Sequence, residues 1–339
     1  MQIYEISAIL TKLGFLATFL TNTLFIVLTL CYSRRVTGAF RNLLVAFSVI
    51  CITFSAVEII VQPYIHNFNG GAVYFSLAVD SYSFLPFDFQ IVLTLAYACC
   101  YVAQLGFIAI QFLYRYFTII QHPMQKSFQG LYQVIWVLYF FAVGGVYGLL
   151  LYYLLPIDDY TDDYMRVEME AVYSRNLLGI PRSMEIPYDG NGRIRWNVVA
   201  YFCSGFFVIN SQYLIIIFCA VKMRKSINTK LATLSARNQR LEKQFFKALA
   251  VQIILPTFLI TIPIGLAMFL PFLDLKFSFQ SGILFFLSSL YPSLDIIATM
   301  WIVDEYKNSM RALGKSIGVD ITTKVDTSSR NGMSVASEN

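Results

Sequence analysis

The sequence predicts an all-α membrane protein, a seven-transmembrane helix bundle with its N-terminus outside and its C-terminus in the cytoplasm. Hydrophobic residues make up 57% of the chain and charged residues only 13%, whereas soluble domains have about 45–50% and about 25%. A membrane-spanning helix needs about 20 predominantly apolar residues. Stretches of that length, nearly free of charge, occur at 13–32, 42–64, 89–114, 131–155, 196–221, 248–273 and 277–303.

The basic residues predict the orientation, because Lys and Arg are retained on the cytoplasmic side of a membrane. With the N-terminus outside, 18 of the 25 basic residues lie on the inner side, and the inverted arrangement would place those 18 outside. The expected parts of the chain are an extracellular segment 1–12, a seven-helix domain 13–303, an amphipathic interfacial helix 304–318 and a disordered cytoplasmic tail 319–339.

The longest outer loop, 156–195, is rich in acidic residues. We interpret it as solvated surface, because the aspartates within 158–163 lack the glycine-bearing spacing of a dedicated calcium loop. A calcium site there is the less favoured alternative. All six cysteines fall within the predicted spans, so the sequence predicts apolar packing for them and no outer disulfide.

The predicted inner surface contains features that suit the docking of a cytoplasmic protein. Arg115 stands at the inner end of the third span, where it either anchors the helix at the lipid headgroups or belongs to the docking surface. Segment 222–247 holds eight basic residues, Lys243 and Lys247 among them, against one acid, Glu242. Apolar residues recur every four positions near its end, so the sixth helix is expected to begin in the cytoplasm. Topology or contact with anionic lipid would explain the charge equally well.

Segment 304–318 predicts contact with membrane lipids. Tyr306, Met310, Leu313 and Ile317 recur at helical spacing with basic residues between them, which is the pattern of a helix lying in the membrane interface. Seven serines and threonines follow in the tail, which makes it a candidate for phosphorylation.

Polar residues and prolines within the spans predict internal contacts or movement. Glu58 is expected in the outer half of the second helix and Asp295 in the inner half of the seventh, so they should not form one site. Pro256 in the sixth span and Pro292 in the seventh each remove a backbone donor and favour a kink. Kinked sixth and seventh helices suit a bundle whose inner ends move.

Aromatic and amide side chains in the outer half or middle of the bundle predict a pocket for a small, partly apolar ligand. The candidates are Tyr97, Tyr101, Gln104, Asn210 and Tyr213. Anchoring at the membrane interface is the competing explanation for any single tyrosine.

Five short motifs, in order along the chain, resemble the Str-type serpentine chemoreceptors of nematodes, a class of G-protein-coupled receptors. They are Gly38-Ala39-Phe40-Arg41 opening the second helix, Pro63-Tyr64-Ile65-His66 closing it, Tyr114-Arg115-Tyr116, Lys243-Gln244-Phe245-Phe246-Lys247-Ala248-Leu249 before Pro256, and Tyr291-Pro292-Ser293-Leu294-Asp295. The resemblance implies a receptor that binds a small external chemical cue and activates a heterotrimeric G protein. It also implies a place in the plasma membrane, typically in the sensory cilia of chemosensory neurons.

The same resemblance implies roles for particular residues. Arg115 takes the G-protein-facing position of the third helix, and Pro292 and Asp295 carry the seventh-helix switch. Pro256 is a further switch candidate, because proline can kink the sixth span. Tyr114 stands where rhodopsin-like receptors have an acid before the arginine, so the sequence does not predict a rhodopsin-style ionic lock.

A seven-helix transporter or a ligand-gated channel without G-protein coupling is the alternative function. A transporter would usually show internal repeats or paired broken helices, and an inverted channel would need its N-terminus inside. Span 277–303 has no lysine for a retinal Schiff base. No cofactor motif, nucleophile–base constellation or nucleic-acid-binding pattern is predicted, so we do not expect an enzyme.

The orientation can be tested with epitopes at the two ends of the chain. An epitope placed after Met1 should bind antibody on intact cells, because the basic residues hold the opposite side in the cytoplasm. An epitope after Asn339 should bind only after permeabilisation. The reverse pattern would overturn both the orientation and the receptor interpretation.

Overall fold

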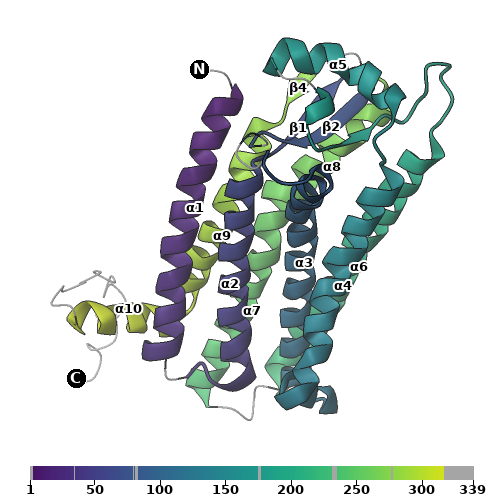
Figure 1. Cartoon of the computed structure of the whole chain (residues 1–339). Coiled ribbons are helices and arrows are strands. Elements are labelled where there is room, and N and C mark those ends of the chain that lie inside the picture. Colours follow the sequence, from purple (N-terminus) through teal and green to yellow (C-terminus); the bar gives the residue numbers. More distant parts are fainter. Residues whose placement is uncertain are drawn as a thin grey trace, which may run out of the picture.

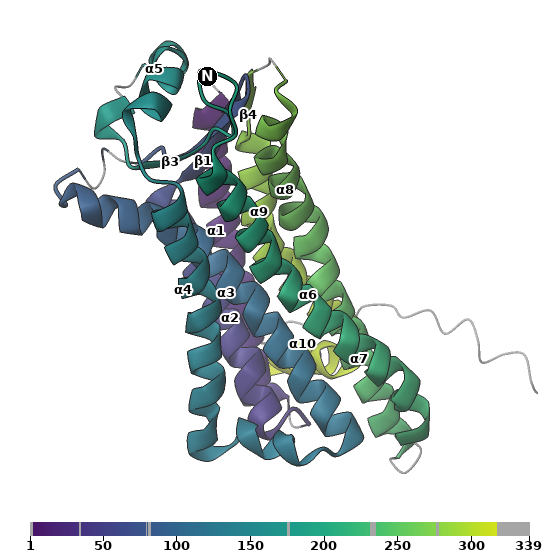
Figure 2. The same cartoon turned by 90° about the vertical axis from the view of Figure 1, so that its right-hand side faces the viewer.

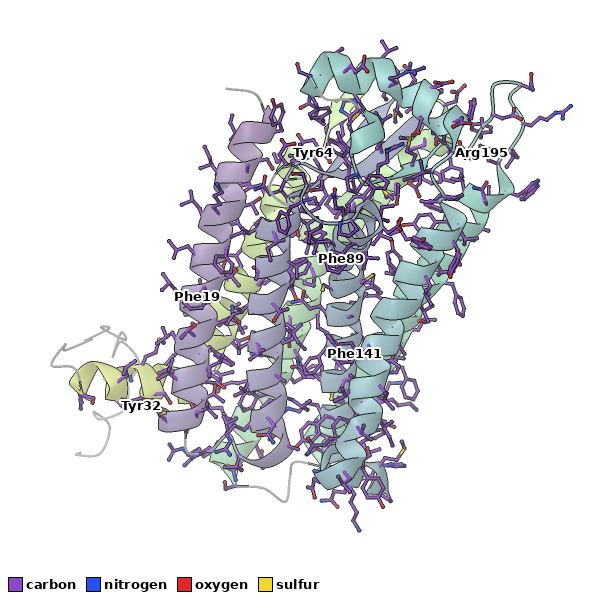
Figure 3. The ribbon with its side chains drawn as sticks, viewed as in Figure 1. Phe19, Tyr32, Tyr64, Phe89, Phe141 and Arg195 are labelled. Carbon is purple, nitrogen blue, oxygen red and sulfur yellow. The ribbon has the colours of Figure 1, made fainter. Side chains whose placement is uncertain are left out.

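The computed structural model describes residues 3–33, 35–78, 80, 83–174, 177–230, 235–275 and 278–316. Within them, seven helical segments are long and apolar enough to cross a membrane, which confirms the predicted bundle (Figure 1). They are Ile6–Tyr32, Gly38–Val61, Phe87–Ile120, Gly130–Leu154, Trp196–Ser226, Ala236–Leu273 and Gly282–Ile302. Phe19 and Phe141 project from the outer surface of the bundle (Figure 3), where large apolar side chains suit contact with lipid.

The central helix is α3 (Phe87–Ile120), which contacts α2 (Gly38–Val61), α4 (Val134–Leu154) and α6 (Trp196–Lys230). On the other side of the bundle, α1 (Ile3–Val27) packs against α2 and α9 (Gly282–Ile302).

Glycine permits the closest of these helix contacts. A Cβ at Gly14 of α1 would lie 2.6 Å from the Cβ of Ser289 in α9, and one at Gly144 of α4 would lie 2.8 Å from the carbonyl oxygen of Cys99 in α3. Either Cβ would force the helices apart, so glycine sets the spacing of α1 from α9 and of α4 from α3.

Two boundaries differ from the sequence prediction. Helix α1 begins at Ile3, so most of the expected extracellular segment 1–12 is helical. Helix α2 ends at Val61, and the motif that begins at Pro63 forms strand β1 (Pro63–Phe68) instead of closing the helix. Proline has no backbone N–H and disfavours right-handed helical geometry in the residue before it. Gln62 ends the helix in a left-handed conformation with a φ of 45°.

A four-stranded antiparallel sheet covers the end of the bundle where the N-terminus lies (Figures 1 and 2). Strands β1 and β2 (Gly71–Ser76) form a hairpin, while β3 (Arg182–Glu185) and β4 (Ser278–Gln280) come from later loops, in the order β3-β2-β1-β4. The sheet therefore joins three loops that are far apart in the sequence.

Helix α5 (Asp159–Tyr173) packs on the outer face of this sheet and over Tyr64 (Figure 3). Asp158 caps its N-terminus by accepting a 2.8 Å hydrogen bond from the Thr161 amide. A buried ion pair fastens the helix to β3, with Arg182 donating to both carboxylate oxygens of Asp162 at 2.8 and 2.5 Å. Such bidentate pairs fix geometry as well as charge.

The interpretation of loop 156–195 as solvated surface is therefore wrong for α5 and β3. Three of its aspartates form ion pairs with arginines: Asp158 pairs with Arg195, Asp162 with Arg182 and Asp163 with Arg166. Among the described residues no group of three or more His, Cys, Asp or Glu could hold a metal ion, so the structure gives the calcium alternative no support.

The opposite end of the molecule has long helical extensions. Helix α7 (Ala236–Pro256) begins well before the apolar span at 248, as its pattern predicts. Helix α10 (Asp304–Ser316) lies across the end of α1 (Figure 1). Its Tyr306 is buried against Phe25 and bonds to Thr29 at 3.0 Å. Ile317 and the serine- and threonine-rich tail lie outside the described residues.

Candidate ligand cavity and interhelical ion pair

A cavity of about 580 Å³ lies beneath the sheet, within the range of about 300–1,000 Å³ that is usual for small-molecule sites. Its walls come from α3, α4, α6 and α8 (Ile262–Phe269), the outer continuation of α7. Aromatic and aliphatic side chains dominate the lining, so the cavity suits a compact and partly apolar molecule.

The sheet forms the roof of the cavity because side chains alternate between the two faces of a strand. Ser183 and Glu185 of β3 line the cavity, whereas Met184 between them joins the apolar cluster that contains the α5 residues. Ala72 and Tyr74 of β2 follow the same rule and also line the cavity. Helix α5 thus holds the roof from outside while alternate residues face the ligand space.

Four of the five predicted ligand residues line this cavity: Tyr97, Tyr101, Asn210 and Tyr213. Gln104 is the exception and is a correction to the predicted pocket. It lies about one helical turn deeper on α3 than Tyr101, where its amide donates to the Cys51 sulfur at 3.2 Å.

The cavity also reaches the lipid-facing surface. Phe206 of α6 and Leu266 of α8 both line it, yet 62% and 60% of their surfaces are exposed on the outside of the bundle. With the sheet and α5 above it, the cavity is therefore open sideways, between α6 and α8.

The inner end of the cavity is bonded to an irregular turn in the sixth span. A π-helical turn, η7 (Thr257–Thr261), follows Pro256 and separates α7 from α8. Tyr101 and Tyr213 both bond to the Thr261 hydroxyl, at 2.5 and 2.8 Å, and Tyr213 also bonds to Thr257 at 2.9 Å. Because π turns interrupt the regular hydrogen-bond ladder, they are frequent at functional sites and at bends.

A second network joins the cavity to α2 and α9. The Tyr97 hydroxyl bonds to Ser288 at 2.6 Å and donates weakly to Glu58 at 3.4 Å, while Ser289 donates to Glu58 at 2.9 Å. Asp295 lies about 9 Å further along α9 than Ser289, and neither of its oxygens bonds to a described residue. The two intramembrane carboxylates therefore occupy separate sites, as predicted.

Arg115 is buried, with only 4% of its surface exposed, and does not reach toward the headgroups as an anchor would. It donates to the Glu242 carboxylate of α7 at 2.7 Å. Its guanidinium carbon lies 3.4 Å from the ring centre of Phe40 in α2 and 4.5 Å from that of Phe245 in α7. One arginine thus connects three helices through an ion pair and two cation–π contacts.

This interhelical ion pair between Arg115 and Glu242 is not among the contacts predicted from the sequence. The acid before Arg115 is absent, but the sixth helix supplies one instead. A sequence signal existed, since Glu242 is the sole acid of its basic segment and lies one helical turn before Phe245. Lys243 and Lys247 are exposed on the other side of α7 and do not share in the contact.

The remaining candidates lie in the sixth and seventh spans, whose prolines predict kinks. Pro292 is buried within α9, where its carbonyl accepts a long 3.5 Å bond from Asn22 of α1. Pro256 is buried at the start of the π turn. The switching roles of Pro256, Pro292 and Asp295 stay predictions.

Glu185 is a cavity residue that the sequence pattern does not indicate, because the four-residue strand β3 that carries it lies within a polar, acidic loop. It is 1% exposed, and neither carboxylate oxygen has a hydrogen-bond partner among the described residues. Burial raises the pKa of Glu185 from 4.5 to about 8, because removing a carboxylate from water disfavours its charged form.

The fold and its two connected sites define a multi-pass membrane protein with a ligand-sized cavity near one end and a buried interhelical ion pair near the other. The family described as serpentine type 7TM GPCR chemoreceptor Str matches residues 7–311. The chain belongs to this family of chemoreceptors.

Similarity to individual relatives also extends over most of the chain. The chain is 32% identical over 315 residues to G-protein coupled receptor str-33 of Caenorhabditis elegans, and the match covers 91% of each chain. It is 24% identical over 305 residues to serpentine receptor class r-10 of Caenorhabditis briggsae, covering 88% of this chain and 87% of that one. Serpentine receptor class r-10 of Caenorhabditis elegans is 22% identical over 278 residues, or 80% of each chain.

The raised pKa of Glu185 predicts a pH dependence of stability. Between pH 4.5 and about 8 the folded chain holds a proton on Glu185 that the unfolded chain has released, so each rise in pH within this window favours unfolding. A Glu185→Gln variant lacks this proton. Its stability relative to wild type should therefore grow as pH rises through the window, measured by thermal unfolding of the purified proteins.

A Glu170→Gln variant is the matched control, because it makes the same Glu-to-Gln replacement at an exposed position on α5. Its unfolding should track wild type at each pH. Parallel curves for wild type and Glu185→Gln would contradict the buried, protonated carboxyl.

Proposed function

We propose that this chain is a chemosensory receptor whose ligand occupies the cavity beneath the sheet and whose inner surface activates a heterotrimeric G protein. One observation carries the proposal. Two of the tyrosines that line the cavity, Tyr101 and Tyr213, form hydrogen bonds to the π turn that continues the helix carrying Glu242. A ligand that moves these rings acts directly on the segment that positions the Arg115 contact.

The Arg115–Glu242 pair holds the resting arrangement. A charge-assisted hydrogen bond is worth about 1.5–3 kcal/mol, and the rings of Phe40 and Phe245 exclude water from the guanidinium. While the pair is intact, the inner end of α7 stays against α3 and covers Arg115. Separation of the two helices would expose Arg115 to a cytoplasmic partner.

The π turn after Pro256 is the hinge of this movement. Proline leaves one backbone acceptor of the preceding turn without its donor, and Thr257 and Thr261 bond to Tyr213 on the cavity side. Helix α7 can therefore change direction there by exchanging hydroxyl bonds, without breaking a regular helix. Exposed Lys243 and Lys247 then belong to the surface that meets the G protein.

The orientation follows from this proposal and from the basic residues. The cavity and sheet face the exterior, α7 and α10 lie at the cytoplasmic side, and α10 contacts lipid headgroups through its basic residues. The plasma membrane of chemosensory cilia is the proposed location, on the strength of the family. A transporter would need a continuous path through the bundle, and the contacts of the described residues do not indicate one.

Removing the charge of Glu242 tests the lock. A Glu242→Gln variant should raise ligand-independent G-protein activation by about tenfold, because a loss of about 1.5 kcal/mol shifts a two-state equilibrium by that factor. The measurement is nucleotide exchange on a panel of heterotrimeric G proteins in membranes with equal receptor amounts. An Arg115→Ala variant should lose exchange altogether, because it removes the proposed contact with the G protein.

The matched control is Glu305→Gln, which removes an acidic charge on the same side at a weak 3.9 Å pair with Arg35. It should leave basal exchange unchanged. If Glu242→Gln behaves like this control at equal surface expression, the pair is a packing contact and the proposed activation route is wrong.

A further inference from the structure

Glu185 places a carboxyl group in an enclosed, largely aromatic space. It ends β3 and is paired with Ala72 of β2, and both residues line the cavity. Arg182, at the other end of this strand, faces the opposite side of the sheet. Its guanidinium donates hydrogen bonds to the Asp162 carboxylate and to the carbonyl oxygens of Leu177 and Ile180. Strand alternation therefore separates Glu185 from the nearest cation in sequence.

No described residue compensates this carboxyl. Glu185 is the only residue with a formal charge among the described side chains that line the cavity. Its electrostatic neighbours there are Tyr147 and Tyr201, whose hydroxyls bond to each other at 3.0 Å and not to Glu185. A buried, unpartnered carboxyl is unfavourable in a folded protein, and such groups concentrate where a ligand supplies the partner.

The rest of the lining offers ring faces. Six tyrosines contribute to it: Tyr74, Tyr97, Tyr101, Tyr147, Tyr201 and Tyr213. Each hydroxyl is bonded to a protein group, which fixes the rings in place, so the aromatic rings make up much of the lining that a ligand meets. Tyrosine faces carry partial negative charge and attract organic cations.

We propose that the cavity binds an organic ammonium ion, with the cationic nitrogen beside Glu185 under the sheet and the apolar part directed toward α6 and α8. This inference rests on the proposed function, since it names the ligand class for the same cavity. Binding of the cation releases the Glu185 proton to solvent, because a nearby positive charge favours the ionised carboxyl. The resulting carboxylate supplies the opposite charge, and the tyrosine rings surround the alkyl groups on nitrogen. The sideways opening between Phe206 and Leu266 accommodates an apolar substituent.

The test uses two probes of equal shape that differ in charge. Benzyltrimethylammonium carries a permanent positive charge, and neopentylbenzene has carbon in place of its nitrogen. Each is titrated against the purified full-length receptor above the pKa of Glu185, with thermal stabilisation as the readout. Wild type, Glu185→Gln and the exposed-charge control Glu170→Gln are compared.

The expected result is stabilisation of wild type and Glu170→Gln by the cation, with the neutral probe weaker by about tenfold or more. Glu185→Gln should bind the cation at least about tenfold more weakly and keep its affinity for the neutral probe, which shows that the variant is folded and its cavity intact.

Equal binding of the two probes by wild type, an unchanged cation affinity in Glu185→Gln, or no binding of either probe would each overturn the inference. These outcomes leave the proposed function standing, because the Glu242→Gln exchange assay uses no ligand and tests the inner contact independently.

Discussion

The inner half of this bundle depends on how one buried arginine is satisfied. Arg115 has a single carboxylate partner, Glu242, and its Nε and Nη2 atoms bond to no described group. The rings of Phe40 and Phe245 keep water from it. A buried charge that loses its only partner is strongly destabilising, so α3 and α7 either stay together or Arg115 gains a new partner. The proposed function rests on this constraint, since activation would require Arg115 to exchange Glu242 for another partner.

The outer half is organised by the sheet, which brings together segments from three loops. Alternation along β2 and β3 divides their side chains between the α5 side and the cavity side. The Arg182–Asp162 pair secures α5 on one face, and Glu185 faces the ligand space on the other. The cavity tyrosines then connect this space to the π turn at Thr261, so both halves meet at the same helix.

The seven spans could be predicted because hydrophobic length is a local property of the sequence. The orientation that the basic residues indicate stays a prediction. The tyrosine wall was also predictable: Tyr97, Tyr101, Asn210 and Tyr213 lie on spans whose facing could be inferred from polarity. Gln104 shares their helical spacing but lies below the Tyr101–Thr261 bond that closes the cavity, and helical spacing does not report depth.

The sheet could not be predicted, since its strands pair across the chain and each is short. Pro63-Tyr64-Ile65-His66 looks like a helix end until its partners Gly71–Ser76 are considered. Glu185 was hidden for the same reason. Glu242 was visible as an isolated acid, but its contact with Arg115 depends on the relative rotation of α3 and α7, which neither helix encodes alone.

The most direct test is the distance between the start of α7 and the turn that follows α3. It is measured by spin labels at Asn238 of α7 and at Met124 in the 3-10 turn Pro123–Phe128, both exposed. The exposed Cys31 and Cys203 would first be replaced by alanine. Wild type should give one short distance, and Glu242→Gln should add a longer population at its expense, because the carboxylate that holds the helices together is gone. Identical distance distributions in the two proteins would contradict the account.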